Sequence, residues 1–339
     1  MAAVCFYFQV HQPFRLRRYS VFDTDPFYFD NEANAGILRK VADKCYRPTT
    51  EKLLDLVRRH QGRFRVSFAV SGTALKQLEE WAPDVLDTLK RLVDTGACEL
   101  LDETSHHSLA FLFSRSEFDE QVRLHRAEVA RLFNGYTPTA FRNTELIYNN
   151  ELAGHVAWLG DYKTVVCEGV DRILGVRSPN YVYAPPQGAT PAGKEPVRLL
   201  LKNYRLSDDI AFRFSDRNWK EWPLDAQRFA KWVNQISGDG NLCNLFMDYE
   251  TFGEHQWAST GIFDFLDKLP EAVFDVNPGQ NGFLTVSEAS AAHRPVGDYS
   301  TEKFISWADS ERDLSAWLGN PLQDNAIAQL YEIEPAVRA

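Results

Sequence analysis

The sequence is poor in cysteine, and the few cysteines it has are scattered. Five are present, Cys5, Cys45, Cys98, Cys167 and Cys243, and no two of them form a CxxC pair. An odd number of isolated cysteines argues against a disulfide framework and against a structural zinc site. A hydrophobic core must therefore hold the fold together.

Long apolar runs and targeting signals are also lacking. No stretch approaches the roughly 20 apolar residues that a membrane-spanning helix needs. The first residues, MAAVCFYFQVHQP, carry no basic region ahead of their short apolar stretch, so they do not resemble a signal peptide. We therefore expect a cytoplasmic protein with no membrane partner.

Basic residues are in deficit. There are 37 Lys and Arg against 47 Asp and Glu, which gives a formal charge of -10 at pH 7. Such a chain repels nucleic acid, so we expect no nucleic-acid partner and favour a neutral substrate. The motifs HExxH, GxGxxG and GxSxG and the Walker loop are absent, which removes support for zincins, for nucleotide binders of those types and for serine hydrolases.

What the chain does contain is enough apolar material for a large globular fold. Its 339 residues are 44% hydrophobic and 25% charged, close to the average of proteins that bury a full core. Aromatic residues reach 13%, with 8 Trp and 13 Tyr. These rings serve either core packing or a surface that stacks on flat ligands such as sugars, and composition leaves both open.

Short apolar runs alternate with longer amphipathic segments along most of the chain. This alternation predicts an α/β fold in which helices cover a parallel sheet. A closed barrel and an open doubly wound sheet both fit, and the number of repeats favours the barrel. Strands are predicted at Ala3–Val10, 63–70, 97–101, 139–145, 163–168, 197–204, Leu242–Asp248 and 283–286. Helices are predicted at 35–60, which Pro48 could interrupt, and at 73–95, 114–133, Asn150–Leu159, 225–236 and 262–274.

Two segments depart from this rhythm. Residues 175–196 are rich in Pro and Gly and include Tyr181 and Tyr183, which predicts either a lid over the substrate or an insertion without a role. Residues 291–339 form a C-terminal segment with an amphipathic, helical pattern that contains Trp307 and Trp317. Because that pattern stops in mid-helix, it is open whether further helices belong to it. We expect residues 1–290 to form the catalytic domain.

Polar side chains follow the predicted strands where these end. His11 follows the first strand, Asp102 and Glu103 follow the third, and Glu145 ends the fourth. Asp248 and Glu250 end the strand at Leu242–Asp248. In parallel α/β folds ligands bind at the carboxyl ends of the strands, so these side chains predict a site there.

Two carboxylates on different strand ends suit glycoside hydrolysis, in which one attacks the sugar and the other must be protonated. Glu145 lies near Arg142 in FRNTELIY, and this cation favours the ionised carboxylate that a nucleophile needs. A buried salt bridge is the alternative for Glu145. Asp248 lies in MDYETFGEHQW, where the charge of Glu250 would help to keep a proton on one carboxyl.

Two other functions stay open on the same residues. His11, Asp102, His106 and His107 could together ligate a metal, as in a metal-dependent polysaccharide deacetylase. A glucan-binding protein that keeps the cleft but not the chemistry is the other alternative. The presence of both carboxylates counts against it.

Five segments in this order resemble glycoside hydrolase family 57, a group of α-amylases, 4-α-glucanotransferases and glycogen branching enzymes. They are VHQP, CELLDETSHHSL, FRNTELIY, MDYETFGEHQW and LTVSEAS, and they span most of the chain. The α-amylase-like branch is the best likeness. The resemblance implies an incomplete (β/α)7 barrel followed by helices, a retaining mechanism, and no metal or cofactor.

The resemblance also assigns roles. It implies that Glu145 is the nucleophile and Asp248 the general acid/base in a reaction on α-1,4-glucans, with hydrolysis and transfer both open. The substrate-binding residues that it implies are His11, His107 and Trp257 at the donor sugar, Glu250 and Glu288 in support, and His106, His255 and Asp102 as further candidates.

Overall fold

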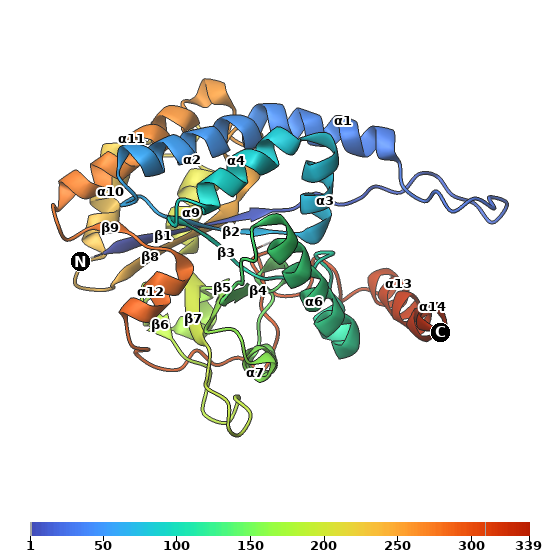
Figure 1. Ribbon diagram of the computed structural model, residues 1–339. Coiled ribbons are helices and arrows are strands. Elements are labelled where there is room, and N and C mark those ends of the chain that lie inside the picture. Colours follow the sequence, from blue (N-terminus) through green and yellow to red (C-terminus); the bar gives the residue numbers. More distant parts are fainter. Residues whose placement is uncertain (1, 309) are drawn as a thin grey trace.

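Parallel strands dominate the computed structural model, which describes residues 2–308 and 310–339 (Figure 1). One sheet has the order β3-β2-β1-β8, with β9 also paired to β1, and the other has the order β4-β5-β7-β6. Only β6 pairs in the antiparallel sense among the strands of the described chain. The strands are β1 Ala3–Val10, β2 Val66–Val70, β3 Cys98–Leu100, β4 Ala140–Arg142, β5 Thr164–Glu168, β6 Val182–Tyr183, β7 Arg198–Lys202, β8 Leu242–Asp248 and β9 Gly282–Phe283. The predicted α/β fold with parallel strands is confirmed.

Helices connect the strands and cover the sheets (Figure 1). They are α1 Asn31–Val41, α2 Arg47–Arg59, α3 Gly72–Trp81, α4 Pro83–Val93, α5 Ala110–Phe113, α6 Arg115–Leu132, α7 Asn150–Leu159, α8 Asp171–Leu174, α9 Tyr204–Ala211, α10 Ala226–Gln235, α11 Ile262–Val276, α12 Val286–Ala292, α13 Pro321–Glu332 and α14 Glu334–Arg338. Shorter turns are the π-helical η1 Ala42–Tyr46 and the 3-10 turns η2 Thr144–Leu146, η3 Tyr249–Thr251 and η4 Ala258–Thr260.

The two sheets contact each other at two places, between β3 and β4 and between β7 and β8. Between β3 and β4, Asp102 forms a parallel bridge with Phe141. Between β7 and β8, the Asn203 amide donates to the Asn244 carbonyl at 2.9 Å. The register pairs Gln9 with Asp248, so the carboxyl ends of β1 and β8 lie side by side.

Helix α12 fills the amino end of the strands. Val286 and Ala289 are fully buried among side chains from inside the strands, such as Tyr7 and Leu200. The Val286 amide donates to Ser67 near the start of β2 at 3.0 Å. The sequence predicted a strand at 283–286, but β9 is only Gly282–Phe283 because the capping box of Thr285 and Glu288 starts the helix.

Proline positions explain two further differences from the predicted helices. Pro48 does not break the first helical stretch: α1, η1 and α2 follow one another without a gap, and Pro48 stands in α2 directly after the wider π-helical turn η1. The predicted helix 73–95 divides at Ala82, since Pro83 begins α4 as a new first turn.

The Pro- and Gly-rich segment lies at the wrong end of the strands to be a lid. Because β6 runs antiparallel to β7, the chain after it reaches the amino ends, where Ala184, Glu195 and Pro196 border Thr164 at the start of β5. Tyr183 is buried and donates to the Ser178 carbonyl at 2.6 Å. The lid interpretation is therefore wrong.

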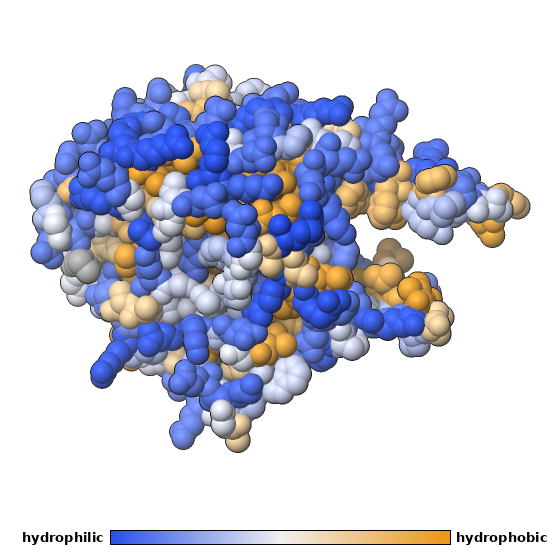
Figure 2. Space-filling view, viewed as in Figure 1, coloured by the Kyte–Doolittle hydropathy of each residue, from blue (hydrophilic) through white to orange (hydrophobic). Residues whose placement is uncertain are grey.

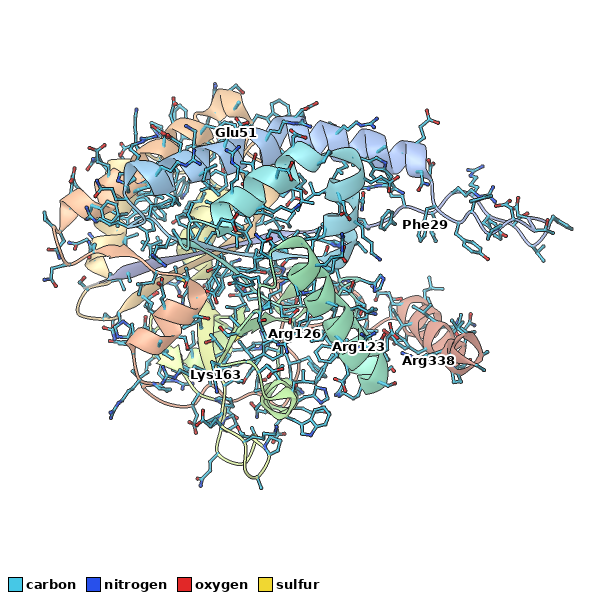
Figure 3. All side chains as sticks on the ribbon, viewed as in Figure 1. Phe29, Glu51, Arg123, Arg126, Lys163 and Arg338 are labelled. Atoms are coloured by element: carbon cyan, nitrogen blue, oxygen red, sulfur yellow. The ribbon has the colours of Figure 1, made fainter. Side chains whose placement is uncertain are left out.

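The C-terminal part is less helical than the sequence suggested. The described residues of 293–320 contain no helix. They run from the amino ends, where the Tyr299 amide donates to the Ala184 carbonyl at 2.8 Å, to the carboxyl ends, where Ile305 pairs with Tyr148. Helices α13 and α14 follow and bury none of their residues. Arg338 pairs with Glu117 of α6, beside which it lies in Figure 3.

An arm projects from the body between β1 and α1 (Figure 1). Leu16 and Phe29 bridge its two sides, while Val21 and Phe22 are about 90% exposed near its tip. Figure 2 shows apolar side chains on this arm and on α13, with a hollow between them. No described helix is long and apolar enough to cross a membrane.

Candidate active site

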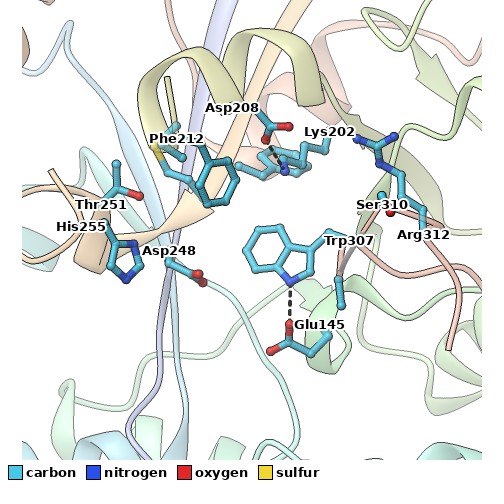
Figure 4. Close-up of a pocket in the computed structure, with 14 residues that line it drawn as sticks. Glu145, Lys202, Asp208, Phe212, Asp248, Thr251, His255, Trp307, Ser310 and Arg312 are labelled. Carbon is cyan, nitrogen blue, oxygen red and sulfur yellow. Dashed lines mark hydrogen bonds and ion pairs between the residues drawn. The ribbon is translucent and has the colours of Figure 1, made fainter. Parts of the chain in front are cut away.

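A cavity of about 470 Å³ opens at the carboxyl ends of the strands. This volume is typical of small-molecule sites. Figure 4 shows Glu145 and Asp248 on one side of the cavity and Lys202, Asp208 and Arg312 on the other. The cavity is lined by Glu145, Lys202, Asp208, Ala211, Phe212, Phe246, Met247, Asp248, Thr251, His255, Trp307, Ala308, Ser310 and Arg312.

Glu145 adopts a rare backbone conformation directly after β4. Its φ is 54° and that of Leu146 is 52°, both in the left-handed region. Such residues cost on the order of 1–3 kcal/mol each and persist where the surrounding structure holds them. Here the Glu145 carbonyl accepts from the Trp307 amide at 3.1 Å and from the Ser306 hydroxyl at 3.0 Å. The C-terminal segment therefore holds Glu145 in place.

Both carboxylate oxygens of Glu145 are hydrogen-bonded. Oε1 lies 2.8 Å from His107 Nε2, and Oε2 accepts from the Trp307 indole at 2.8 Å. Burial alone would raise the pKa of Glu145, but the His107 hydrogen bond and the Arg142 charge outweigh it and lower the pKa to about 2. Glu145 is therefore an ionised, oriented carboxylate.

His107 lies between two carboxylates. Its Nδ1 is 3.1 Å from Glu103 Oε2, while its Nε2 faces Glu145. Burial would lower the pKa of His107, yet the hydrogen bonds to Glu103 and Glu145 raise it above its usual value. The His11 ring stacks on the His107 ring, with the ring centres 4.0 Å apart. Burial, followed by the charge of His107, lowers the pKa of His11 to about 3. The raised pKa favours the cationic form of His107, which would interact favourably with the Glu145 carboxylate.

Asp248 presents an accessible carboxyl to the cavity at the end of β8. The protein around it and the negative charge of Glu145 raise its pKa, which Arg142, His255 and Lys202 partly oppose. The two carboxyls are therefore driven in opposite directions: Glu145 toward the ionised form and Asp248 toward the protonated form.

Glu250 lies behind Asp248 and is 8% exposed. Tyr46 donates to its Oε1, and the Gln12 amide lies 3.4 Å from the same oxygen. Burial and the Asp248 charge raise the pKa of Glu250 to about 7. Glu250 is not among the residues that line the cavity, so its interaction within the site is with the charge of Asp248.

Glu250→Gln should make the folded state less sensitive to alkaline pH. Because burial raises the pKa of Glu250 in the folded state, its favourable contribution is complete in acid and is lost as pH rises through about 7. The variant should gain up to about 3 kcal/mol of unfolding free energy relative to wild type between pH 5 and pH 9. Urea unfolding at both pH values measures this, and an equal difference at the two values would contradict it.

The structure does not bring every predicted residue to the cavity. Asp102 is fully buried and its carboxylate pairs with His125, Arg126 and Tyr162, so substrate cannot reach it. Glu288 lies at the opposite end of the strands, where it pairs with Arg65 at 2.6 Å and caps α12. These two expectations are corrected.

Of the remaining predicted residues His255, Trp257 and His106, one lines the cavity. His255 lines the cavity beside Asp248. Trp257 is 62% exposed and lies outside the cavity lining, under the Lys44 ammonium at 5.8 Å. His106 is exposed, and its charged neighbours are Lys76 and Glu117 rather than the two cavity carboxylates.

Three residues of the site or its surroundings are not predicted from the sequence as functional. Trp307 was noticed only as part of a helical pattern, and nothing local shows that its indole reaches Glu145. Glu103 was noted at a strand end but not assigned a role, although its spacing of four from His107 is a local signal. Lys202 ends β7, as Asp248 ends β8, so the strand-end rule could have found it.

The proposed metal-binding set is not assembled. Across residues 2–308 and 310–339, no group of three or more His, Cys, Asp or Glu side chains is placed to hold a metal ion. Asp102 faces α6, while His11 contacts Ser71 and His107 contacts Glu145.

Fold and site define an α/β protein with a two-carboxylate cavity at the carboxyl ends of its parallel strands. The family model for glycosyl hydrolase family 57 matches residues 5–302. A Methanocaldococcus jannaschii protein named "Putative alpha-amylase" is 43% identical over 336 residues, which cover 97% of this chain and 68% of that protein. The chain belongs to glycosyl hydrolase family 57.

Solved structures show the same fold at low sequence identity. The 4-alpha-glucanotransferase of Thermococcus litoralis is 17% identical with a TM-score of 0.68, and the match covers 99% of this chain but 46% of that one. A GH57 branching enzyme of Thermococcus kodakaraensis is 12% identical with a TM-score of 0.69, covering 98% and 78%. A Mycobacterium smegmatis structure named "putative polysaccharide deacetylase" is 13% identical with a TM-score of 0.54, and the match covers 89% of this chain and 94% of that one.

Proposed function

We propose that this protein is a retaining glycoside hydrolase of the α-amylase type that acts on α-1,4-glucans. The observation that carries the proposal is the contrast between Glu145, whose pKa falls to about 2, and Asp248, whose pKa is raised, across one cavity. Membership of family 57 and the relative named as an alpha-amylase support it.

In the proposed mechanism Glu145 attacks the anomeric carbon while Asp248 protonates the departing oxygen. The glycosidic C–O bond breaks and a covalent bond to Glu145 replaces it. The Asp248 carboxylate then takes a proton from water, whose oxygen attacks the same carbon and releases Glu145. His107 and Trp307 hold Glu145 in position, and each carboxylate oxygen keeps a lone pair for the attack.

We also infer that the strands form an incomplete (β/α)7 barrel. The Asp102–Phe141 bridge and the hydrogen bond from Asn203 to Asn244 support a continuous wall around the cavity end. The side chains that α12 covers at the amino end would then form the interior of the barrel. Residues 291–339 are proposed as a C-terminal extension that contributes Trp307 and Arg312 to the cavity.

Transfer to a second glucan is the alternative outcome on the same residues. An acceptor hydroxyl would replace water in the second step. Structural neighbours named as a glucanotransferase and a branching enzyme support this alternative. The deacetylase alternative has a fold-level likeness only, and its metal-binding set is not assembled.

Product analysis with maltoheptaose should decide between hydrolysis and transfer. We expect only shorter products, released at first as the α-anomer because retention needs two displacements. Chromatography measures product length, and proton NMR during the first turnovers measures the anomer. Longer products would establish transfer, while an initial β-anomer would contradict the retaining mechanism.

A further inference from the structure

A polar group faces the catalytic carboxylates from the far wall of the cavity, and the proposed mechanism does not use it. Lys202 ends β7, Asp208 belongs to α9 and Arg312 comes from the C-terminal segment (Figure 4). Two distant parts of the chain, residues 202–208 and the segment of Arg312, thus meet at this wall.

Lys202 is a nearly buried cation in a defined position. Its side chain is 8% exposed, and its Nζ lies 3.2 Å from Asp208 Oδ1 and 3.8 Å from Glu168 Oε2. The same nitrogen lies 5.2 Å from the centre of the Trp307 ring. A buried ammonium needs such partners to offset its lost hydration. Since Lys carries three N–H donors, Asp208 leaves donors free for a ligand.

Glu168 anchors this wall from beneath. It is fully buried, its Oε1 accepts from the Gly169 amide at 2.8 Å, and its Oε2 has no hydrogen-bond partner among the described residues. Arg312 Nε lies 3.8 Å from that same oxygen. Glu168 thus holds both cations at the wall without facing the cavity itself.

Charge balance shows what kind of ligand suits the wall. Asp208 and Glu168 balance Lys202 and Arg312, so no net positive charge is left over for an anion. The wall instead offers a donor and an acceptor side by side, between the rings of Phe212 and Trp307. A pyranose has the same features: apolar faces that pack on aromatic rings, and neighbouring hydroxyls about a hydrogen-bond length apart.

We propose that Lys202 and Asp208 together bind two neighbouring hydroxyl groups of a glucosyl unit held between Phe212 and Trp307. The pair then determines which sugar configuration fits the cavity, because a sugar lacking either hydroxyl leaves a buried polar group unpaired. This inference rests on the proposed function and names two specificity residues for it.

The test measures binding in a form that cannot turn substrate over. In a Glu145→Gln background, calorimetry gives the affinity for methyl maltoside and for each of its monodeoxy analogues. At two neighbouring positions of the sugar, the monodeoxy analogue should bind the Glu145→Gln parent about tenfold or more weakly than methyl maltoside does. A loss of this size is expected for hydrogen bonds to charged groups. Adding Lys202→Met or Asp208→Ala should abolish the penalty at the hydroxyl that the changed residue binds, and adding both changes should abolish both penalties.

Two further variants separate recognition from folding. Lys202→Met leaves the buried Glu168 without one of its cations. The double variant Lys202→Met with Glu168→Gln also removes that unpaired charge. The double variant should lose discrimination between the analogues as Lys202→Met does. Lys163→Met changes an exposed lysine at the amino end of β5 and should keep the full pattern. If the Lys202 and Asp208 variants still bind the deoxy analogues as much more weakly than methyl maltoside as the parent does, the proposal is overturned. No binding of any maltoside by the parent would overturn the proposed function itself.

Discussion

Glu145→Gln should abolish turnover of maltoheptaose while leaving the protein folded. The amide keeps the shape but cannot form the covalent bond, so kcat should fall by a factor on the order of 10⁶, the scale found when another enzyme loses its nucleophile. The buried His107 keeps its second carboxylate partner, Glu103, in this variant, so the fold should hold. Reducing-sugar release measures turnover, and circular dichroism checks the fold.

Glu288→Gln is the matched control for this variant. Glu288 is also a carboxylate within a segment that resembles the family, but it lies at the amino ends of the strands with Arg65. Its removal should leave kcat unchanged and lower the unfolding free energy by about 1 kcal/mol, through the lost cap and the partly exposed ion pair. Substantial activity in Glu145→Gln, or inactivity in Glu288→Gln, would exclude the assignment of the nucleophile.

Asp248→Asn should impair the enzyme selectively, according to the leaving group. Loss of a general acid typically costs about 10²–10⁴-fold, so hydrolysis of maltoheptaose should fall by that factor. The first step with α-maltosyl fluoride needs no proton on its leaving group and should keep most of its rate. A burst of fluoride release measures that step. Equal losses with both substrates would show that Asp248 does not act as the acid.

The pH profile gives a second measurement of the same pair. Asp248 must be protonated in the first step, so its raised pKa extends activity to higher pH. The rate of hydrolysis should fall as pH rises through that pKa. On the acid side, Glu145 must be ionised, and its pKa of about 2 keeps it so throughout the usual assay range. The residual hydrolysis of maltoheptaose by the Asp248→Asn variant should therefore lose the alkaline decline that wild type shows. Retention of that decline would assign it to another group.

Much of the strand and helix pattern is predictable because it depends on local periodicity. Ala3–Val10 and Leu242–Asp248 are found from their mostly apolar runs, which are typical of parallel strands buried on both faces. The same local pattern locates polar residues at strand ends. It cannot say to which side they turn, and this is where Asp102 was misjudged: it faces the core, whereas nearby His107 reaches Glu145.

Segments far apart in the sequence decide the rest of the site. Trp307 meets Glu145 across 162 positions, and Glu99 bonds Ser287 across 188, which draws the segment around Glu288 to the amino end. No spacing rule spans such distances, because long-range contacts depend on how the strands are ordered and which ends they share.

The sequence by itself determined the fold class, the family likeness and the pair Glu145 and Asp248, since each depends on residues close together in the chain. Only the tertiary structure decided which neighbours these carboxylates have. It placed His107, Trp307 and Arg142 around Glu145, and Glu250 behind Asp248. The opposite pKa shifts arise from burial and from charges a few ångströms away, and those distances exist only in the folded chain.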